Sequence, residues 1–576
     1  MSSEKNYKKI TLYIVFFYFF LLSFSQFYNQ HWTSILDQDP IIIYNSLLIS
    51  SGFEQEYRDH PAYTTFLILG GIFKLLSIFF ENFKLNELLL SDNIDQKFQL
   101  LFYISRIINT FCIFLSIFLL SKILEELKTK KITSIICIMF ASFFLATYEL
   151  LYLIRSEIIS LMLLLVSIYY FLKFIKKENL IYSIFCGIFF ALAILAKVQI
   201  IFLIFIFIVS IPFLFIYLKD NLDISVNKKF YSYKTGIFII SIFIVFFLLY
   251  QVFLGIIFFK ETNDETFFLT NNVDFYFFIA FVIFYRLLTY ILNKKKLINS
   301  ELIIISLSSI IIGFILCLMF IFFLDFVNLI PAHKSIFIRI LSPIEFMSMH
   351  TYKARLELVN IFVSIKEYLI LGFYGLSYDF NDLYDPKIFS IKNRVFFRIC
   401  YLILILTLLL ISIRKLKSKK IVPIISIFSL GVIIYYLLLN IRETHGYNIY
   451  LLPLYIFIIA IIFTHLNKKN NLIFGIILLS ITLFENYNFI DIHKNAFTRE
   501  PRVADICKLK NWENSKNYFN DKYFSSHIKL VYPESVDGWL FKYLNKFFTN
   551  KEGFKNYCLQ VKNYNQNKIN FYFKKF

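Results

Sequence analysis

Two acidic side chains stand two residues apart just after the first apolar segment of the chain. They are Asp37 and Asp39, and His60 follows further along the same polar stretch. A carboxylate at the mouth of a transmembrane helix can accept a proton from an incoming nucleophile or hold a metal ion. The pattern favours such chemistry at a membrane surface. The alternative is a solvated loop in which acidic residues merely cluster.

Three further charged residues interrupt apolar sequence and are candidates for substrate binding. Arg155 and Glu157 lie at a turn between two apolar stretches, where charges face a cavity, a partner or interfacial water rather than lipid. Residues two apart do not face each other along a helix, so we expect these two to serve different partners. Lys197 ends a long apolar run. It could extend to the lipid headgroups or bind a phosphate as a point charge.

A short polar loop late in the chain adds Arg442, His445 and Tyr447. All three side chains can donate hydrogen bonds to an anionic leaving group. The alternative is a tight turn anchored by interfacial aromatic residues. The scattered histidines form no credible metal cage. If a divalent cation binds, its candidate ligands are Asp37, Asp39 and Glu157.

The composition points to a membrane protein. Of 576 residues, 58% are hydrophobic, and a soluble chain of this size could not bury so much apolar surface. The formal net charge of +20 comes mainly from short Lys and Arg clusters between apolar stretches and in the C-terminal region. The preference for positive loops on the cytoplasmic side explains this charge, so we expect no nucleic-acid partner.

The basic clusters also predict a topology. Lysines before the first apolar stretch place the N-terminus in the cytoplasm and the Asp37–Pro61 region outside. The stretch 62–80 is long enough to cross the membrane, but crossing would leave Lys130, Lys131 and the later lysines facing outward. We therefore interpret 31–98 as one external loop that contains interfacial helices.

The resulting prediction is an all-α polytopic membrane protein with about 13 transmembrane helices. We expect a transmembrane domain over 1–489, a second external loop at 325–394 and a small external C-terminal domain over 490–576. The protein is expected in the bacterial inner membrane, with its C-terminus external. After the first span, the expected spans lie near 99–121, 132–151, 157–175, 180–197, 198–218, 235–259, 275–292, 298–324, 395–413, 421–441, 449–466 and 472–489.

Taken in order, these motifs resemble those of the integral-membrane glycosyltransferases of clan C. That group includes the protein O-mannosyltransferases and the aminoarabinose transferase of lipid A. The chain departs from the pattern at Pro40, where many relatives have Glu, and at Glu157, where Asp is commoner. The residues that carry the resemblance are Asp37 and Asp39, His60-Pro61, Arg106, Arg155 with Glu157, the segment from Gly187 to Lys197, and Tyr450 with Pro453.

The resemblance implies transfer of a sugar from a polyprenyl-phosphate carrier to a lipid, glycan or protein acceptor on the external face. Asp39 would act as general base, with Asp37 as its competitor, and a single displacement would invert the anomeric carbon. Cationic groups of Lys197, Arg442 and His445 would stabilise the departing phosphate. Asp37 and Glu157 would support the base or bind a metal.

Two other classes of protein remain open at this point. A lipid-linked oligosaccharide polymerase or ligase would place its site in the 325–394 segment rather than at Asp39. A transporter or flippase would carry charges within its spans and show discontinuous helices or internal repeats. The sequence has few charges within its apolar stretches and no detectable repeat, which disfavours this class.

Overall fold

The computed structural model describes residues 2–27, 39–55, 62–80, 83, 94–151, 153–222, 273–294, 300–330, 403, 407, 410, 421–439 and 449–497. Several predictions fall outside these ranges. They concern Asp37, His60, Arg442, His445, Tyr447, the span near 235–259, nearly all of the span near 395–413, most of the second external loop and the C-terminal region from residue 498 onward.

All elements within the described ranges are helical, as predicted. They are α1 (Ser2–Phe27), α2 (Asp39–Ser50), α3 (Tyr63–Phe79), α5 (Ile94–Glu126), α6 (Lys131–Phe143), α7 (Leu145–Leu151), α8 (Ser156–Lys177), α9 (Leu180–Ala196), the short 3-10 helix η3 (Val198–Ile200), α10 (Ile201–Leu222), α13 (Val273–Lys294), α14 (Ser300–Phe326), α19 (Ile421–Leu439), α20 (Leu451–His465) and α21 (Lys468–Phe497).

Five of these helices are long and apolar enough to cross a membrane, judged by length and composition. Their spanning portions are Gln99–Glu126, Ser156–Lys177, Val198–Leu218, Leu302–Phe326 and Lys468–Tyr487. The predicted helical membrane architecture is therefore confirmed in the described part of the chain. The total of about 13 spans stays a prediction.

One predicted span differs from the structure. The stretch 132–151 is divided into α6 and α7, because Phe144 between them has an extended backbone. Asn486 of α21 donates a hydrogen bond from its side-chain amide to the Phe143 carbonyl. This contact satisfies a backbone acceptor that the interruption leaves without its helical partner.

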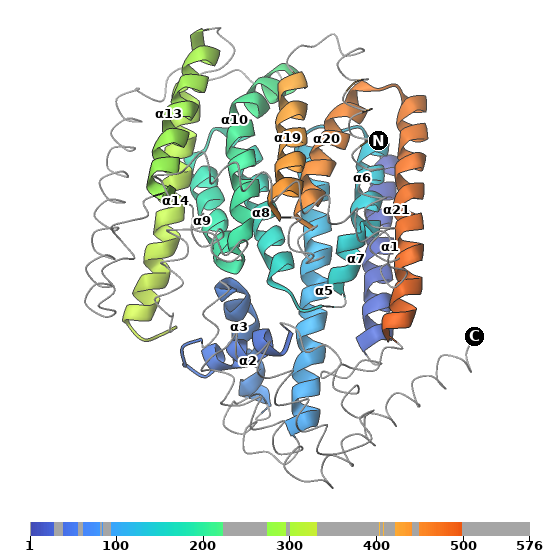
Figure 1. The fold of residues 1–576 in the computed structure, drawn as a ribbon, viewed down its shortest axis with the longest axis vertical. Coiled ribbons are helices and arrows are strands. Elements are labelled where there is room, and N and C mark those ends of the chain that lie inside the picture. The colour runs from blue at the N-terminus through green and yellow to red at the C-terminus, as the bar shows by residue number, and fades with distance from the viewer. Residues whose placement is uncertain are drawn as a thin grey trace.

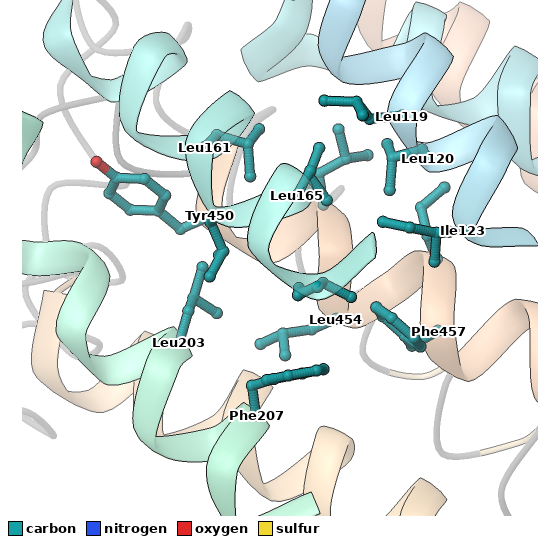
Figure 2. Close-up of a cluster of buried hydrophobic side chains, with 14 of the residues drawn as sticks. Leu119, Leu120, Ile123, Leu161, Leu165, Leu203, Phe207, Tyr450, Leu454 and Phe457 are labelled. Carbon is teal, nitrogen blue, oxygen red and sulfur yellow. The ribbon is translucent and has the colours of Figure 1, made fainter. Parts of the chain in front are cut away.

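Figure 2 shows part of the buried core, with Leu119, Leu120 and Ile123 of α5 and Leu161 and Leu165 of α8 near side chains of α10 and α20. The core also includes residues of α1, α6, α9, α14 and α19. Residues Leu451 to Phe463 of α20 are all buried. A helix that is apolar on all sides and buried all round belongs at the centre of a bundle.

Helices α8 and α9 pack antiparallel in a fixed register. The Ser160 hydroxyl donates to the Ala193 carbonyl at 2.8 Å, and the Ser167 hydroxyl donates to the Cys186 carbonyl at 2.6 Å. Such bonds between helices help hold a membrane bundle together, where the lipid supplies no hydrophobic drive. This register brings the start of α8 beside the end of α9.

Helix α9 also crosses α14 at very short range, and the two lie next to each other in Figure 1. A methyl group added at Gly187 would overlap with the Ile310 carbonyl oxygen, and one added at Gly313 would overlap with the Ile184 carbonyl oxygen. Only glycine permits this backbone contact, as is common at helix interfaces in membranes.

Lysines predicted on one side of the membrane meet at one end of the bundle. The Lys8 ammonium of α1 lies 2.8 Å from a Glu125 carboxylate oxygen near the end of α5. Lys173 near the end of α8 lies 2.8 Å from Glu126. We call the residues Lys8, Lys122, Glu125, Glu126, Lys173 and Lys176 the basic end. The start of α1 and the end of α5 therefore lie at the same end of the bundle. The chain leaves this end along α1 and returns to it along α5.

Helices α2 and α3 pack together at the opposite end of the bundle (Figure 1). Their contact is close, since a methyl group added at Gly70 would meet the Ser46 carbonyl oxygen at 2.7 Å. The Thr64 hydroxyl of α3 donates to the Leu192 carbonyl near the end of α9, at 2.9 Å. This helix pair therefore lies against the end of the bundle that carries Lys197.

Candidate active site

Asp39 begins α2 and is completely buried. An acidic residue in the first turn of a helix, followed by proline, is a favourable start because the free N–H groups there carry partial positive charge. Its Oδ2 accepts a hydrogen bond from the Ile154 backbone N–H at 2.9 Å. The first acidic motif is thereby joined to the turn that holds Arg155 and Glu157.

That turn is a true interruption between α7 and α8. Helix α7 ends at Leu151, α8 begins at Ser156, and Arg155 between them is extended, with φ −133° and ψ 141°. Asn109 of α5 is buried beside it. Its side-chain nitrogen donates to the Leu150 carbonyl at 2.7 Å and to the Leu153 carbonyl at 2.9 Å.

Glu157 and Lys197 form an ion pair at the ends of α8 and α9. Their charged atoms are 3.1 Å apart, and the side chains are only 4% and 1% exposed, respectively. The Glu157 carboxylate also accepts from its own backbone N–H. Burying two charges costs free energy that close pairing offsets only in part. Lys197 is buried within the protein and does not extend to lipid headgroups.

One arginine, Arg155, adds positive charge near this pair. Arg155 lies close enough to Glu157 to interact with it electrostatically. Arg155 precedes α8 with an extended backbone, and the expectation that these two residues serve different partners stays a prediction. Arg106 is fully buried on α5, with its guanidinium carbon 4.1 Å from the centre of the Phe102 ring.

The structure thus brings together four of the predicted site residues at one end of the bundle. We call Asp39, Arg155, Glu157 and Lys197, with the Ile154 N–H, the buried site. The other predicted residues, Asp37, His60, Arg442, His445 and Tyr447, are outside the described ranges. Tyr450, which follows the loop of the last three, is buried in the same cluster as Leu161, one turn beyond Glu157 in α8 (Figure 2).

The structure shows no complete set of metal ligands within the described ranges. No group of three or more His, Cys, Asp or Glu side chains gathers there in a way that could hold a metal ion. Asp39 and Glu157, two of the predicted ligands, accept hydrogen bonds from backbone N–H groups and, at Glu157, pair with Lys197.

Sequence reasoning overlooked the residue that joins these parts, Asn109. The available signal was an amide side chain within the apolar run of α5, where a polar group needs a buried partner. The sequence did not indicate which partner, because the two carbonyls that Asn109 contacts belong to another helix pair.

The fold and the buried site define a multi-pass helical membrane protein with paired acidic and basic groups at one end. Residues 102–250 match the family model of dolichyl-phosphate-mannose-protein mannosyltransferases. The matched segment contains Arg106, Asn109, Glu157 and Lys197, and Asp39 precedes it. A comparison with curated proteins finds no match. The predicted resemblance is confirmed over this segment, which is similar to membrane glycosyltransferases of the mannosyltransferase type.

Proposed function

We propose that this protein transfers a sugar from a polyprenyl-phosphate carrier to a hydroxyl-bearing acceptor at the external face of the inner membrane. Asp39 is the general base. The observation that carries the proposal is the buried Asp39 carboxylate, which is held by the Ile154 N–H of the turn that leads to Arg155 and Glu157, and Glu157 pairs with the buried Lys197. The family match over residues 102–250 supports the same class of reaction.

The reaction is a single displacement. The acceptor oxygen attacks the anomeric carbon while the Asp39 carboxylate takes the hydroxyl proton. The new oxygen–carbon bond forms as the bond from that carbon to the phosphate oxygen breaks, so the anomeric carbon is inverted. The polyprenyl phosphate leaves with the bonding electrons.

A carboxylate has enough lone pairs for two tasks at once. In Asp39, Oδ2 is held by the Ile154 N–H, which fixes the orientation of the side chain. A general base must lie within hydrogen-bond reach of the proton it removes, so a fixed orientation favours catalysis. We propose that Oδ1 faces the acceptor.

The leaving phosphate needs cationic groups in a place with little water. Lys197 is buried, and Arg155 lies near the same carboxylate, so two cations share one counter-charge at Glu157. We propose that Lys197 and Arg155 bind the phosphate, together with Arg442, His445 and Tyr447 from the loop before α20. The polar residue His60 completes the acceptor side.

The sidedness also supports an external site. The lysines of the basic end lie opposite the buried site, and positive loops face the cytoplasm in most membrane proteins. On this basis the N-terminus is cytoplasmic and Asp39 faces outward. The C-terminal region from 490 onward is proposed to be an external domain.

The experiment is Asp39→Asn in purified membranes, assayed for transfer of a radiolabelled sugar from its polyprenyl phosphate. We expect the rate to fall by about 10²- to 10⁴-fold, the usual contribution of a general base. The variant keeps the size of the side chain and an oxygen that accepts from Ile154.

Asp37→Asn is measured in parallel, because Asp37 is the competing base. The matched control is Glu126→Gln, which removes an acidic charge from the basic end and keeps the wild-type rate. Wild-type activity in Asp39→Asn would overturn the assignment of Asp39, and a full loss in Asp37→Asn alone would transfer it to Asp37.

A further inference from the structure

The interruption between α7 and α8 contains an exchange of hydrogen-bond partners. In a continuous α-helix, the N–H of each residue bonds to the carbonyl four residues earlier. The Ile154 N–H would then reach the Leu150 carbonyl, and the Glu157 N–H would reach the Leu153 carbonyl. In the structure, the Ile154 N–H instead bonds to Asp39, and the Glu157 N–H bonds to its own carboxylate.

Both carbonyls released by this exchange are taken by one side chain. The Asn109 amide nitrogen donates to the Leu150 and Leu153 oxygens, at 2.7 and 2.9 Å. A primary amide carries two hydrogens on one nitrogen, so it can replace two backbone donors. The side chain of Asn109 is buried, with 3% of its residue surface exposed, so water cannot easily take its place.

We propose that Asn109 is a positioning residue, which holds α7 and α8 apart so that the Ile154 N–H can orient the catalytic carboxylate of Asp39. The proposal rests on the function assigned to Asp39 above. It gives Asn109 a role in the reaction although the side chain touches no reacting atom.

Leaving the Leu150 and Leu153 carbonyls without donors would cost free energy. A buried acceptor that loses its partner costs about 1–3 kcal/mol. If Asn109 is replaced by an apolar residue, the chain can recover this energy by continuing α7 into α8. The Ile154 N–H then bonds to the Leu150 carbonyl and leaves Asp39.

The test compares Asn109→Leu, which keeps the branched shape and the number of side-chain heavy atoms but removes both donors, with Asn109→Gln, which keeps the amide. For Asn109→Leu we expect kcat to fall about 10- to 100-fold, on the order of what misplacing a reacting group by 1 Å costs. The KM for the polyprenyl-phosphate sugar changes less than about twofold, because the cationic residues remain. Asn109→Gln recovers part of the lost kcat.

Ser167→Ala is the matched control. Its hydroxyl is also buried and also donates to a carbonyl of a neighbouring helix, that of Cys186 in α9, but Ser167 lies far along α8 from the buried site. We expect wild-type kcat for Ser167→Ala. An equal loss of kcat in both variants would show that any buried bond between helices has this effect, and would overturn the proposal.

A double-mutant cycle separates positioning from general stability. On the Asp39→Asn background, Asn109→Leu should lower the residual rate by less than about threefold, because the carboxylate it positions is already gone. A further loss as large as that in the wild-type background would overturn the proposal.

Failure of this inference can be told from failure of the proposed function. If the wild-type protein transfers no sugar from a polyprenyl phosphate, the proposed function fails. If it is active and Asn109→Leu keeps wild-type kcat, only the role of Asn109 fails. A structure of Asn109→Leu is the readout that needs no activity, and an Ile154 N–H still bonded to Asp39 in it would overturn the proposal. If Asn109→Leu does not fold, Asn109→Ser, which supplies one donor, replaces it in every arm.

Discussion

Helices α5 and α8 run between two sets of charged residues that are paired in different surroundings. At the basic end, Lys8 and Glu125 are 18% and 47% exposed, and Lys173 and Glu126 are 26% and 12% exposed. In the buried site, Glu157 and Lys197 are 4% and 1% exposed. The distances within these pairs are similar, at 2.8 Å for the first two and 3.1 Å for the third.

The comparison shows that distance alone says little about what an ion pair contributes. A pair in contact with water is screened and adds little stability. A buried pair has lost its hydration, so the two charges depend on each other, and removing one leaves the other at a high cost. Such an arrangement is costly for folding but useful for holding a leaving phosphate.

The largest expected effect is that of Lys197→Met. Glu157 then loses its close partner in a buried place, and we expect the free energy of unfolding to fall by about 3–5 kcal/mol. The measurement is chemical unfolding of the purified protein in detergent. Equal stability of the variant and the wild type would mean that water reaches Glu157. The ion pair of the buried site would then contribute no more to stability than the pairs of the basic end.

The double variant Glu157→Leu with Lys197→Met separates stability from function. It removes both charges, so we expect it to recover most of the stability lost in Lys197→Met. Sugar transfer should still fall by about 100-fold or more, because the cation proposed to bind the phosphate is gone. Unfolding and sugar transfer are measured on the same preparation of the double variant. Recovery of activity along with stability would show that the ion pair has only a structural role.

A smaller effect is expected for Ser160→Ala. The change removes the hydroxyl that bonds to Ala193 and supports the register of α8 and α9 beside the ion pair. The Ala193 carbonyl still accepts the Lys197 backbone N–H at 3.0 Å, so no acceptor is left alone. We expect a loss of about 1 kcal/mol in unfolding experiments. A loss as large as that of Lys197→Met would contradict this order of effects.

The smallest effect is expected at the basic end, for Glu126→Gln. Its partners Lys173 and Lys176 remain in contact with water, so we expect the free energy of unfolding to change by less than about 1 kcal/mol. High salt should remove even this difference, because salt screens exposed charges. A large, salt-independent loss would show that the basic end resembles the buried site.

Much of the helical arrangement was predictable because apolar length and charged interruptions are visible in sequence. The end of α9 at Lys197 and the turn between Leu151 and Ser156 were both predicted from charges within apolar runs. The break at Phe144 was not, since no charge or proline marks it and its support comes from Asn486 of α21.

The candidate site was predictable to a similar extent. Asp39, Glu157 and Lys197 stood out as charges beside apolar stretches, and the structure places them at one end of the bundle. Their connections were not predictable. The link from Asp39 to the Ile154 N–H and the two bonds of Asn109 involve backbone atoms, which every residue possesses and which leave no mark in sequence.

The glycine contact between α9 and α14 has a consequence for the order of assembly during synthesis. Gly187 is made well before Gly313, so α9 enters the membrane without the backbone surface that it finally rests against. The Lys197 end of α9 can find Glu157 early, because α8 immediately precedes it in the chain. The side of α9 that carries Gly187 must wait for α14. A nascent chain halted before Gly313 would therefore hold the ion pair of the buried site on a helix that still lacks one of its neighbours.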